Sequence, residues 1–152
     1  MWGTCLGFEA MAIWAADEGR DVLGQFNAHA ISLPIYFTKD PEDTKMFGDL
    51  GYEAETFNTK KMLLNSHSYG VDPNKFNTDA GLSSLFTLTS ISYEPEGDHK
   101  PFTATMESEK YPFFGVQFHP EKPAFMFTNN SGVNHTWESI EMNQHFANYF
   151  VE

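Results

Sequence analysis

A single cysteine between two glycines, close to the start of the sequence, constrains the fold more than any other feature. Cys5 lies in Gly3-Thr4-Cys5-Leu6-Gly7 and is the one cysteine of the 152 residues. Glycines two residues before and after a nucleophile are typical of a nucleophile elbow, in which a strand turns sharply into a helix. The positive end of the helix macrodipole then favours the thiolate. We therefore expect a short strand, then Cys5, then a helix over 8–18 that ends at Gly19.

The composition is that of one folded domain covering residues 1–152. Apolar residues make up 41% and aromatic residues 16% of the chain, which is enough to build a core. The net charge of −12 argues against nucleic-acid binding, which needs a basic face. An anionic ligand would need local help from lysines such as Lys61, Lys110 or Lys122.

Several further classes are excluded or indicated by short sequence patterns. A lone cysteine cannot form an internal disulfide and does not suffice for the common cysteine-rich zinc sites. No apolar run reaches the roughly 18 residues needed to cross a membrane, and the first residues do not resemble a signal peptide. Two glycosylation sequons, at Asn129 and Asn134, hint at a secretory or lysosomal route.

The apolar pattern predicts the remaining elements. Residues 86–93, 102–107 and 111–118 have strand patterns, and their hairpin-length connections predict antiparallel neighbours. The other expected elements are an extended segment over 30–38, which Pro34 marks as an edge strand or a bulge, a loop with a helical turn over 41–51, an apolar run over 61–65, and a helix over 137–150 with Ile140, Ala147 and Phe150 toward the core.

His119 is the best-placed histidine to act as the base that a cysteine nucleophile needs. It follows an apolar strand directly, and Pro120 stops that strand, which leaves the imidazole at the edge of the sheet. Glu121 is close enough in sequence to orient the ring. His67 follows another apolar run, in a segment that fits a site loop and an ordinary turn equally well. The remaining histidines fit surface or core positions: His29, His99, His135 and His145.

Two long motifs resemble the gamma-glutamyl hydrolase family, which belongs to the class I glutamine amidotransferase-like group. They are Gly3-Thr4-Cys5-Leu6-Gly7-Phe8-Glu9 and Thr105-Met106-Glu107-Ser108-Glu109-Lys110-Tyr111-Pro112-Phe113-Phe114-Gly115-Val116-Gln117-Phe118-His119-Pro120-Glu121-Lys122. They occur in the family's order, with comparable stretches between and after them at 33–38, 65–69 and 147–151. The resemblance covers nearly the whole chain and implies an α/β fold with a flavodoxin-like, three-layer arrangement around the elbow.

The resemblance implies a cysteine hydrolase that cleaves the γ-glutamyl bonds of folate or antifolate poly-γ-glutamates without a metal or cofactor. In this mechanism Cys5 attacks the γ-carbonyl and forms a thioester, His119 moves the proton, and Glu121 orients His119. A lysosomal, vacuolar or extracellular location follows from the same resemblance. The oligomeric state is open, a homodimer being the assembly considered.

Three further residues are assigned to substrate binding by the resemblance. They are Leu6, whose backbone N–H would donate to the oxyanion, together with Glu9 and His67. The elbow and the Gly-Val-Gln-Phe-His-Pro-Glu motif also look like glutaminase domains, which supply ammonia to biosynthetic enzymes. Those domains typically carry Gln where this chain has Glu9, so Glu9 favours the hydrolase. A glutaminase domain of an amidotransferase and an inactive remnant remain as alternatives.

The family has a substantial portion before its elbow, whereas only four residues precede Cys5 here. That portion contains the first βα units, the second oxyanion donor and part of the substrate pocket. We therefore expect this chain to be the C-terminal part of a single domain. We also expect it to be weakly active or inactive on its own, because losing one oxyanion donor costs roughly 10²–10³ in rate.

Overall fold

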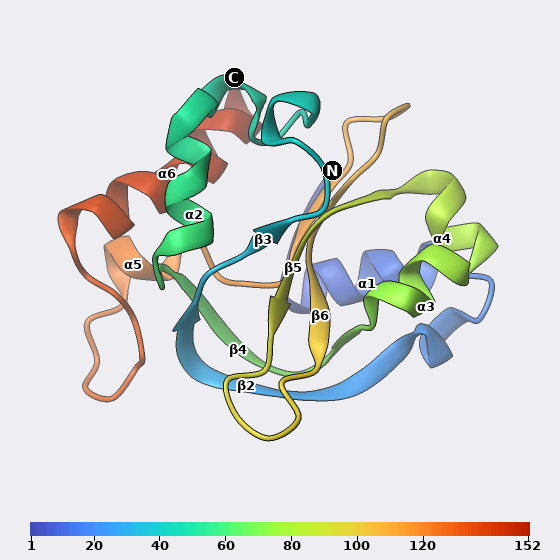
Figure 1. Ribbon diagram of the computed structural model, residues 1–152, viewed down its shortest axis with the longest axis horizontal. Coiled ribbons are helices and arrows are strands. Elements are labelled where there is room, and N and C mark those ends of the chain that lie inside the picture. Colours follow the sequence, from blue (N-terminus) through green and yellow to red (C-terminus); the bar gives the residue numbers. More distant parts are fainter.

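The computed structural model describes residues 1–152, the whole chain (Figure 1). The strands are β1 (Trp2–Thr4), β2 (Leu23–Leu33), β3 (Tyr36–Phe37), β4 (Leu63–Val71), β5 (Thr87–Tyr93), β6 (Pro101–Glu107) and β7 (Phe114–Val116). The α-helices are α1 (Leu6–Ala15), α2 (Glu55–Thr59), α3 (Pro73–Thr78), α4 (Ala80–Leu85), α5 (Lys122–Phe125) and α6 (Trp137–Val151). Short 3₁₀ helices are η1 (Gly19–Val22), η2 (Pro41–Asp43) and η3 (Gly48–Ala54).

Five strands form the central sheet in the order β1-β7-β6-β5-β3. β1 and β7 run parallel, while β5, β6 and β7 are antiparallel neighbours, as their hairpin-length connections predicted. β2 and β4 form a separate antiparallel ribbon with irregular register between Gln25 and Ile31. In Figure 1 this ribbon curves below the β5–β6 pair.

Helices cover both faces of the central sheet, which gives the expected three-layer α/β arrangement (Figure 1). On one face α1, α3 and α4 bury an apolar cluster that includes Phe8 and Met106. On the other face α2 and α6 bury a cluster that includes Phe146 and Val116. Removing these apolar faces from water is the main force that holds the layers together.

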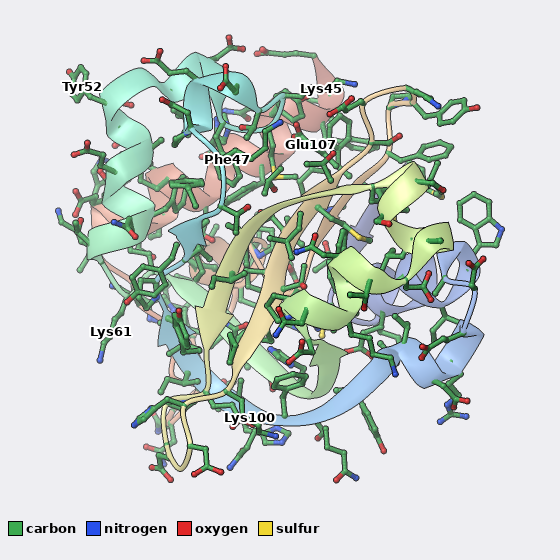
Figure 2. All side chains as sticks on the ribbon, turned by 45° about the vertical axis from the view of Figure 1, so that its right-hand side comes forward. Lys45, Phe47, Tyr52, Lys61, Lys100 and Glu107 are labelled. Carbon is green, nitrogen blue, oxygen red and sulfur yellow. The ribbon has the colours of Figure 1, made fainter.

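A buried carboxylate fixes the segment between β3 and α2 to the end of the sheet. Glu107, the last residue of β6, accepts hydrogen bonds from the amides of Lys45 and Met46 at 2.8 and 3.1 Å. The Lys45 ammonium donates to the carbonyls of Ser108 and Glu109 at 2.8 and 2.7 Å. Lys45 and Glu107 lie close together at one end of the molecule in Figure 2. The two amide donors compensate the cost of burying the Glu107 carboxylate.

The first helix ends earlier than the sequence indicates. α1 stops at Ala15 and the next residue is extended, so the expectation that Gly19 ends the helix was wrong. The amides of Asp17 and Glu18 instead donate to the Asp79 carboxylate at 3.0 and 3.1 Å. These long-range hydrogen bonds turn the chain toward α4 before another helical turn can form.

The segments around two predicted strands are organised differently from the prediction. The extended segment over 30–38 is divided, because Pro34 separates β2 from β3, and β2 begins seven residues earlier, at Leu23. The apolar run over 61–65 is the start of a longer strand, β4, which continues through His67.

The strand expected over 111–118 is shorter than predicted, since β7 covers Phe114–Val116 only. Beyond β7 the His119 amide donates to the Leu64 carbonyl of β4 at 2.8 Å. The chain therefore leaves the central sheet and crosses to the β2–β4 ribbon, which places His119 where the two sheets meet.

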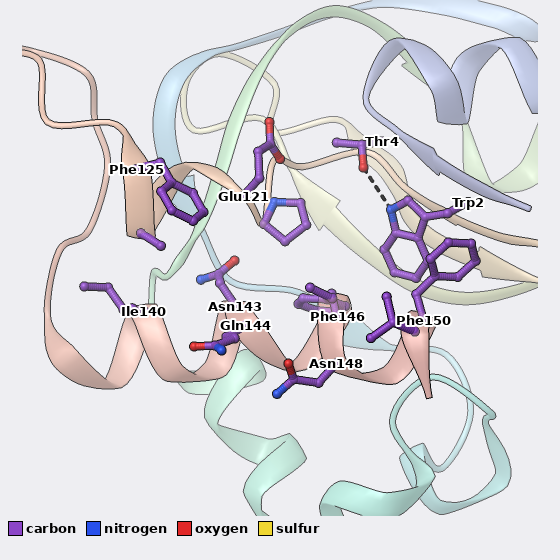
Figure 3. Close-up of a pocket in the computed structure, with 14 residues that line it drawn as sticks. Trp2, Thr4, Glu121, Phe125, Ile140, Asn143, Gln144, Phe146, Asn148 and Phe150 are labelled. Atoms are coloured by element: carbon purple, nitrogen blue, oxygen red, sulfur yellow. Dashed lines mark hydrogen bonds between the residues drawn. The ribbon is translucent and has the colours of Figure 1, made fainter.

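The C-terminal helix is present, but it buries a different face from the predicted one. Phe146 is buried together with the polar residues Ser139 and Asn143. Asn143 donates to the Met62 carbonyl at 3.1 Å, which fixes the rotation of the helix. Three residues were expected in the core: Ile140, Ala147 and Phe150. Instead, their side chains border an open cavity between α6 and β1 (Figure 3). No helix of the protein is long and apolar enough to cross a bilayer.

Phe146 is the centre of the core on the α6 face, and its loss should be costly. Its side chain is 1% exposed, and its ring centroid lies 5.2, 5.4 and 5.8 Å from those of Phe118, Phe57 and Phe47. We expect Phe146→Ala to lower the free energy of unfolding by about 3–5 kcal/mol, because it leaves a cavity. Urea unfolding followed by circular dichroism measures this. The control Phe125→Ala, at a side chain 83% exposed, should change it by less than about 0.5 kcal/mol; equal losses would contradict the prediction.

Candidate active site

Cys5 lies at the turn between β1 and α1 in a backbone conformation that is rare for residues with side chains. Its φ is 51° and its ψ is −104°, a conformation that persists only where neighbouring contacts hold it. The Cys5 amide donates to the Val116 carbonyl of β7 at 2.9 Å. Gly3 allows the turn to close, because a Cβ there would lie 2.5 Å from Met11 Sδ and 2.7 Å from the Gly7 carbonyl. The strained strand-to-helix turn is that of a nucleophile elbow.

The Cys5 thiol faces groups from two other parts of the chain. Its sulfur is 3.9 Å from the Ser66 carbonyl oxygen on β4 and 4.0 Å from Gln117 Nε2, just beyond β7. The sheet that carries Cys5 and the ribbon that carries Ser66 therefore meet at the nucleophile.

His119 is held between Cys5 and Glu121. Its Nδ1 donates to Glu121 Oε1 at 2.8 Å, which leaves Nε2 for the sulfur. Hydrogen bonding to Cys5, the larger cause, and to Glu121 raises the pKa of His119 from 6.5 to about 9, although burial opposes this. Burial favours the neutral form of Glu121, but hydrogen bonding to His119 and nearby positive charges together lower the pKa of Glu121. The imidazole is therefore protonated at neutral pH, with partners on both sides.

Leu6 provides a backbone donor beside the nucleophile. It is the first residue of α1, and its side chain is 73% exposed. The N–H groups of a first helical turn have no acceptor within the helix. The Leu6 amide can therefore donate to an oxyanion that forms on a group attached to Cys5, a role that depends on the backbone.

Glu9 is buried in the first turn of α1 and connects to the nucleophile through Gln117. Gln117 Nε2 donates to Glu9 Oε1 at 3.1 Å and lies 4.0 Å from Cys5 Sγ. Burial raises the pKa of Glu9, and the bond from Gln117 opposes this rise. Gln117 was quoted within the second sequence motif but was given no role. The signal that could have indicated one is its place in the sequence, two residues before His119.

His67 is buried in β4, and both ring nitrogens are engaged within that strand. Nδ1 is 2.8 Å from the Tyr69 carbonyl and Nε2 is 3.0 Å from Asn65 Oδ1. Burial lowers the pKa of His67 to about 4, with the positive charges of His29 and His119 adding to the effect. A neutral ring has one N–H, so His67 donates to only one of these two oxygens. The role of His67 in substrate binding stays a prediction.

The other predicted positions take no part in the arrangement of Cys5, His119 and Glu121. Asn129 is exposed in the segment between α5 and α6. Asn134 Nδ2, the atom that would carry a glycan, donates to the Lys61 carbonyl at 2.9 Å, so a glycan there would leave one N–H for this bond. His135 and His145 donate to the backbone carbonyls of Met126 and Met46, outside the site. No cluster of three or more histidine, cysteine or acidic side chains is arranged to hold a metal ion.

The assembled groups have the parts of an acyl-transfer centre: a nucleophile, a base with an orienting carboxylate, and a free backbone N–H. Residues 1–126 match the family model of the class-I glutamine amidotransferases. The chain therefore belongs to the class-I glutamine amidotransferase family.

Its relatives within this group are gamma-glutamyl hydrolases. The chain is 31% identical to gamma-glutamyl hydrolase 1 of Arabidopsis thaliana, over 99% of this chain and 43% of that protein. It is 26% identical to gamma-glutamyl hydrolase of Rattus norvegicus, over 99% of this chain and 46% of that protein. The chain thus spans less than half the length of these relatives.

A solved structure supports the fold. The chain superimposes on a protein from Thermoplasma acidophilum that is assigned as part of a GMP synthase. The TM-score is 0.51, over 99% of this chain and 56% of that one. The two are 14% identical, so this likeness concerns the fold alone.

The charge state of His119 can be tested directly. We expect its imidazole to titrate near pH 9, and Cys5→Ser to lower this midpoint more than Glu121→Gln does, because Cys5 is the larger cause of the raised pKa. NMR of ¹³C-labelled histidine measures the titration, with the signal assigned through His119→Gln. Since this pKa is raised in the folded state, the protonated ring stabilises the fold below pH 6.5, and the effect disappears as pH rises through about 9. A His119 midpoint near 6.5 in the unmodified protein would refute the pairing.

Replacing the buried Glu9 charge should stabilise the protein. Glu9→Gln keeps an acceptor for Gln117 and offers a donor to Gln117 Oε1, which is buried without a partner. Because the pKa of Glu9 is raised on folding, its ionisation destabilises the fold as pH increases. We expect Glu9→Gln to raise the free energy of unfolding at pH 8 by up to about 1 kcal/mol. The difference between the two proteins should be smaller at pH 4, and urea unfolding measures both values. The exposed Glu96→Gln is the control, and a loss of stability at pH 8 would contradict the prediction.

Proposed function

We propose that the centre formed by Cys5, His119 and Glu121 hydrolyses γ-glutamyl amide bonds through a thioester on Cys5. The observation that supports this most directly is the strained Cys5 elbow beside a His119–Glu121 pair joined at 2.8 Å. A protonated imidazole next to a cysteine favours the thiolate, the form that attacks a carbonyl carbon.

The reaction has two balanced steps. In the first, the Cys5 sulfur bonds to the γ-carbonyl carbon, the carbon–nitrogen bond breaks, and the departing nitrogen takes a proton from His119 Nε2. In the second, water adds to the thioester carbon and gives a proton to His119, and the carbon–sulfur bond breaks to restore the thiolate. The Leu6 amide donates to the oxyanion in both steps, and Glu121 keeps the ring oriented.

The γ-glutamyl group is proposed from the relatives, which are named gamma-glutamyl hydrolases. We extend this to the poly-γ-glutamates of folates and antifolates, which the sequence motifs imply. Because the chain covers less than half of those proteins, the proposal concerns the reactive centre that these residues carry, and its test includes chemistry on Cys5 that does not require full turnover.

Removing the nucleophile should abolish this chemistry. In line with the weak activity expected from the sequence, we expect the protein to release glutamate from γ-L-glutamyl-L-glutamate only slowly. Cys5→Ser or His119→Gln should abolish that release, because these groups act as a unit. His99→Gln, at a histidine bonded to the Glu94 carbonyl away from the thiol, is the matched control and should not change the rate.

Mass spectrometry after exposure to an activated γ-glutamyl ester supplies the second readout. A γ-glutamyl adduct on Cys5, absent in Cys5→Ser, supports the thioester. Faster release of ammonia from glutamine than of glutamate from the dipeptide would indicate a glutaminase instead. Neither turnover nor an adduct would indicate an inactive remnant.

A further inference from the structure

A cavity of about 420 Å³ opens beside the general base. His119 and Ser66 form its inner wall, and the Ser66 carbonyl oxygen is 3.9 Å from Cys5 Sγ. Its outer wall comes from the segment that follows α5, over 128–131, and Lys122 of α5 completes the lining. The cavity is therefore continuous with the catalytic centre on the side of the base.

The charge of this cavity is opposite to that of the protein. The chain has a net charge of −12, yet no acidic residue lines this cavity, and Lys122 does. The larger cavity beside α6, of about 540 Å³, is lined by Glu121 and by no lysine or arginine (Figure 3). Of the three lysines that the sequence offered for an anionic ligand, Lys61 and Lys110 line neither cavity.

Lys122 has the capacity to bind an anion here. Its Nζ is 3.9 Å from Glu121 Oε1, beyond hydrogen-bond distance, and that oxygen already accepts from His119 at 2.8 Å. An ammonium has three donors. The lysine side chain is 37% exposed, so it can turn its donors toward a ligand in the cavity.

The outer wall of the cavity is fixed before any ligand binds. Ser32 Oγ, on β2, donates to the Gly132 carbonyl at 2.7 Å, and Asn134 Nδ2 donates to the Lys61 carbonyl at 2.9 Å. Gly132 has a φ of +70°, and a Cβ there would lie 1.7 Å from the Ala30 carbonyl oxygen, so only glycine permits this contact. A wall tied to β2 and to the segment just before β4 gives a preformed site, which costs less to order on binding.

The chemistry of the base determines what enters this space. His119 gives its proton to the departing nitrogen, so that nitrogen must lie within hydrogen-bond distance of the ring. Its remaining atoms then occupy the space that His119 borders. Ammonia would leave such a space empty, whereas an amino acid has further atoms and a carboxylate next to the nitrogen.

We infer that Lys122 pairs, in this cavity, with the α-carboxylate of the amino acid that departs. The inference rests on the proposed hydrolysis of γ-glutamyl bonds and specifies the leaving side of the substrate. Lys122 is a specificity residue in this arrangement, because it contacts the group that departs and takes no part in the proton transfer.

Two substrates with the same acyl group and different leaving groups test the assignment. In γ-L-glutamyl-L-glutamate the leaving group carries an α-carboxylate, whereas in γ-L-glutamyl-p-nitroanilide it carries none. We expect Lys122→Gln to lower kcat/KM for the dipeptide about tenfold and to leave that for the anilide within twofold. Lys110→Gln, at an exposed lysine outside the cavity, is the matched control and should affect neither substrate.

The remaining outcomes separate this inference from the proposed function. Equal losses on both substrates would mean that Lys122 acts through Glu121 and His119, which overturns the inference and leaves the hydrolase intact. No loss on either also overturns it. If neither substrate turns over, calorimetry on Cys5→Ser protein decides. The inference is supported if Lys122→Gln weakens binding of the dipeptide about tenfold and leaves binding of glutamine unchanged. It is overturned if the dipeptide binds equally well with and without Lys122→Gln, or does not bind at all.

Discussion

The hydrogen bond from the His119 amide to the Leu64 carbonyl, at 2.8 Å, is the contact on which the geometry of the site depends. It joins the end of β7 to β4 and so fastens the central sheet to the β2–β4 ribbon. The parallel pairing of β1 with β7 places Cys5 beside the same crossing point, and β4 brings Ser66 to it. The positions of nucleophile and base are therefore set by backbone hydrogen bonds, which hold side chains more rigidly than loops do.

The electrostatics of the site are local and independent of the net charge. A charge of −12 would by itself repel an anionic substrate, but exposed charges farther away than about 8–10 Å are largely screened at physiological ionic strength. Beside the thiol a ligand meets the protonated His119, and Lys122 lines the cavity that His119 borders. Burial also raises the pKa of Glu9, and the hydrogen bond from Gln117 opposes this rise.

The sequence predicted the class of fold because its strongest signals are local. An elbow requires particular residues at fixed spacing, and the hairpins of β5, β6 and β7 are short, so both could be recognised without tertiary information. The consecutive helices α3 and α4 were missed, although each has a recognisable start. Asp72 caps the first ahead of Pro73, and Asp79 caps the second. These capping patterns can be recognised in the sequence. The hydrogen bonds from Asp17 and Glu18 to Asp79, which follow the end of α1, cannot be recognised there because they are long-range.

The site shows the same division between local and long-range information. His119 and Glu121 are two residues apart, so their hydrogen bond could be anticipated, whereas Gln117 and Glu9 are joined across 108 residues of sequence. Lys61, Lys110 and Lys122 were equivalent candidates in the sequence, since nothing local distinguishes a lysine on a cavity wall from one on the surface. The crossing from β7 to β4 removes this equivalence: it turns the chain at His119 so that Lys122, three residues on, faces the space beside the base. In the proposed mechanism, the backbone contact that positions His119 therefore also positions the lysine that would meet the departing group.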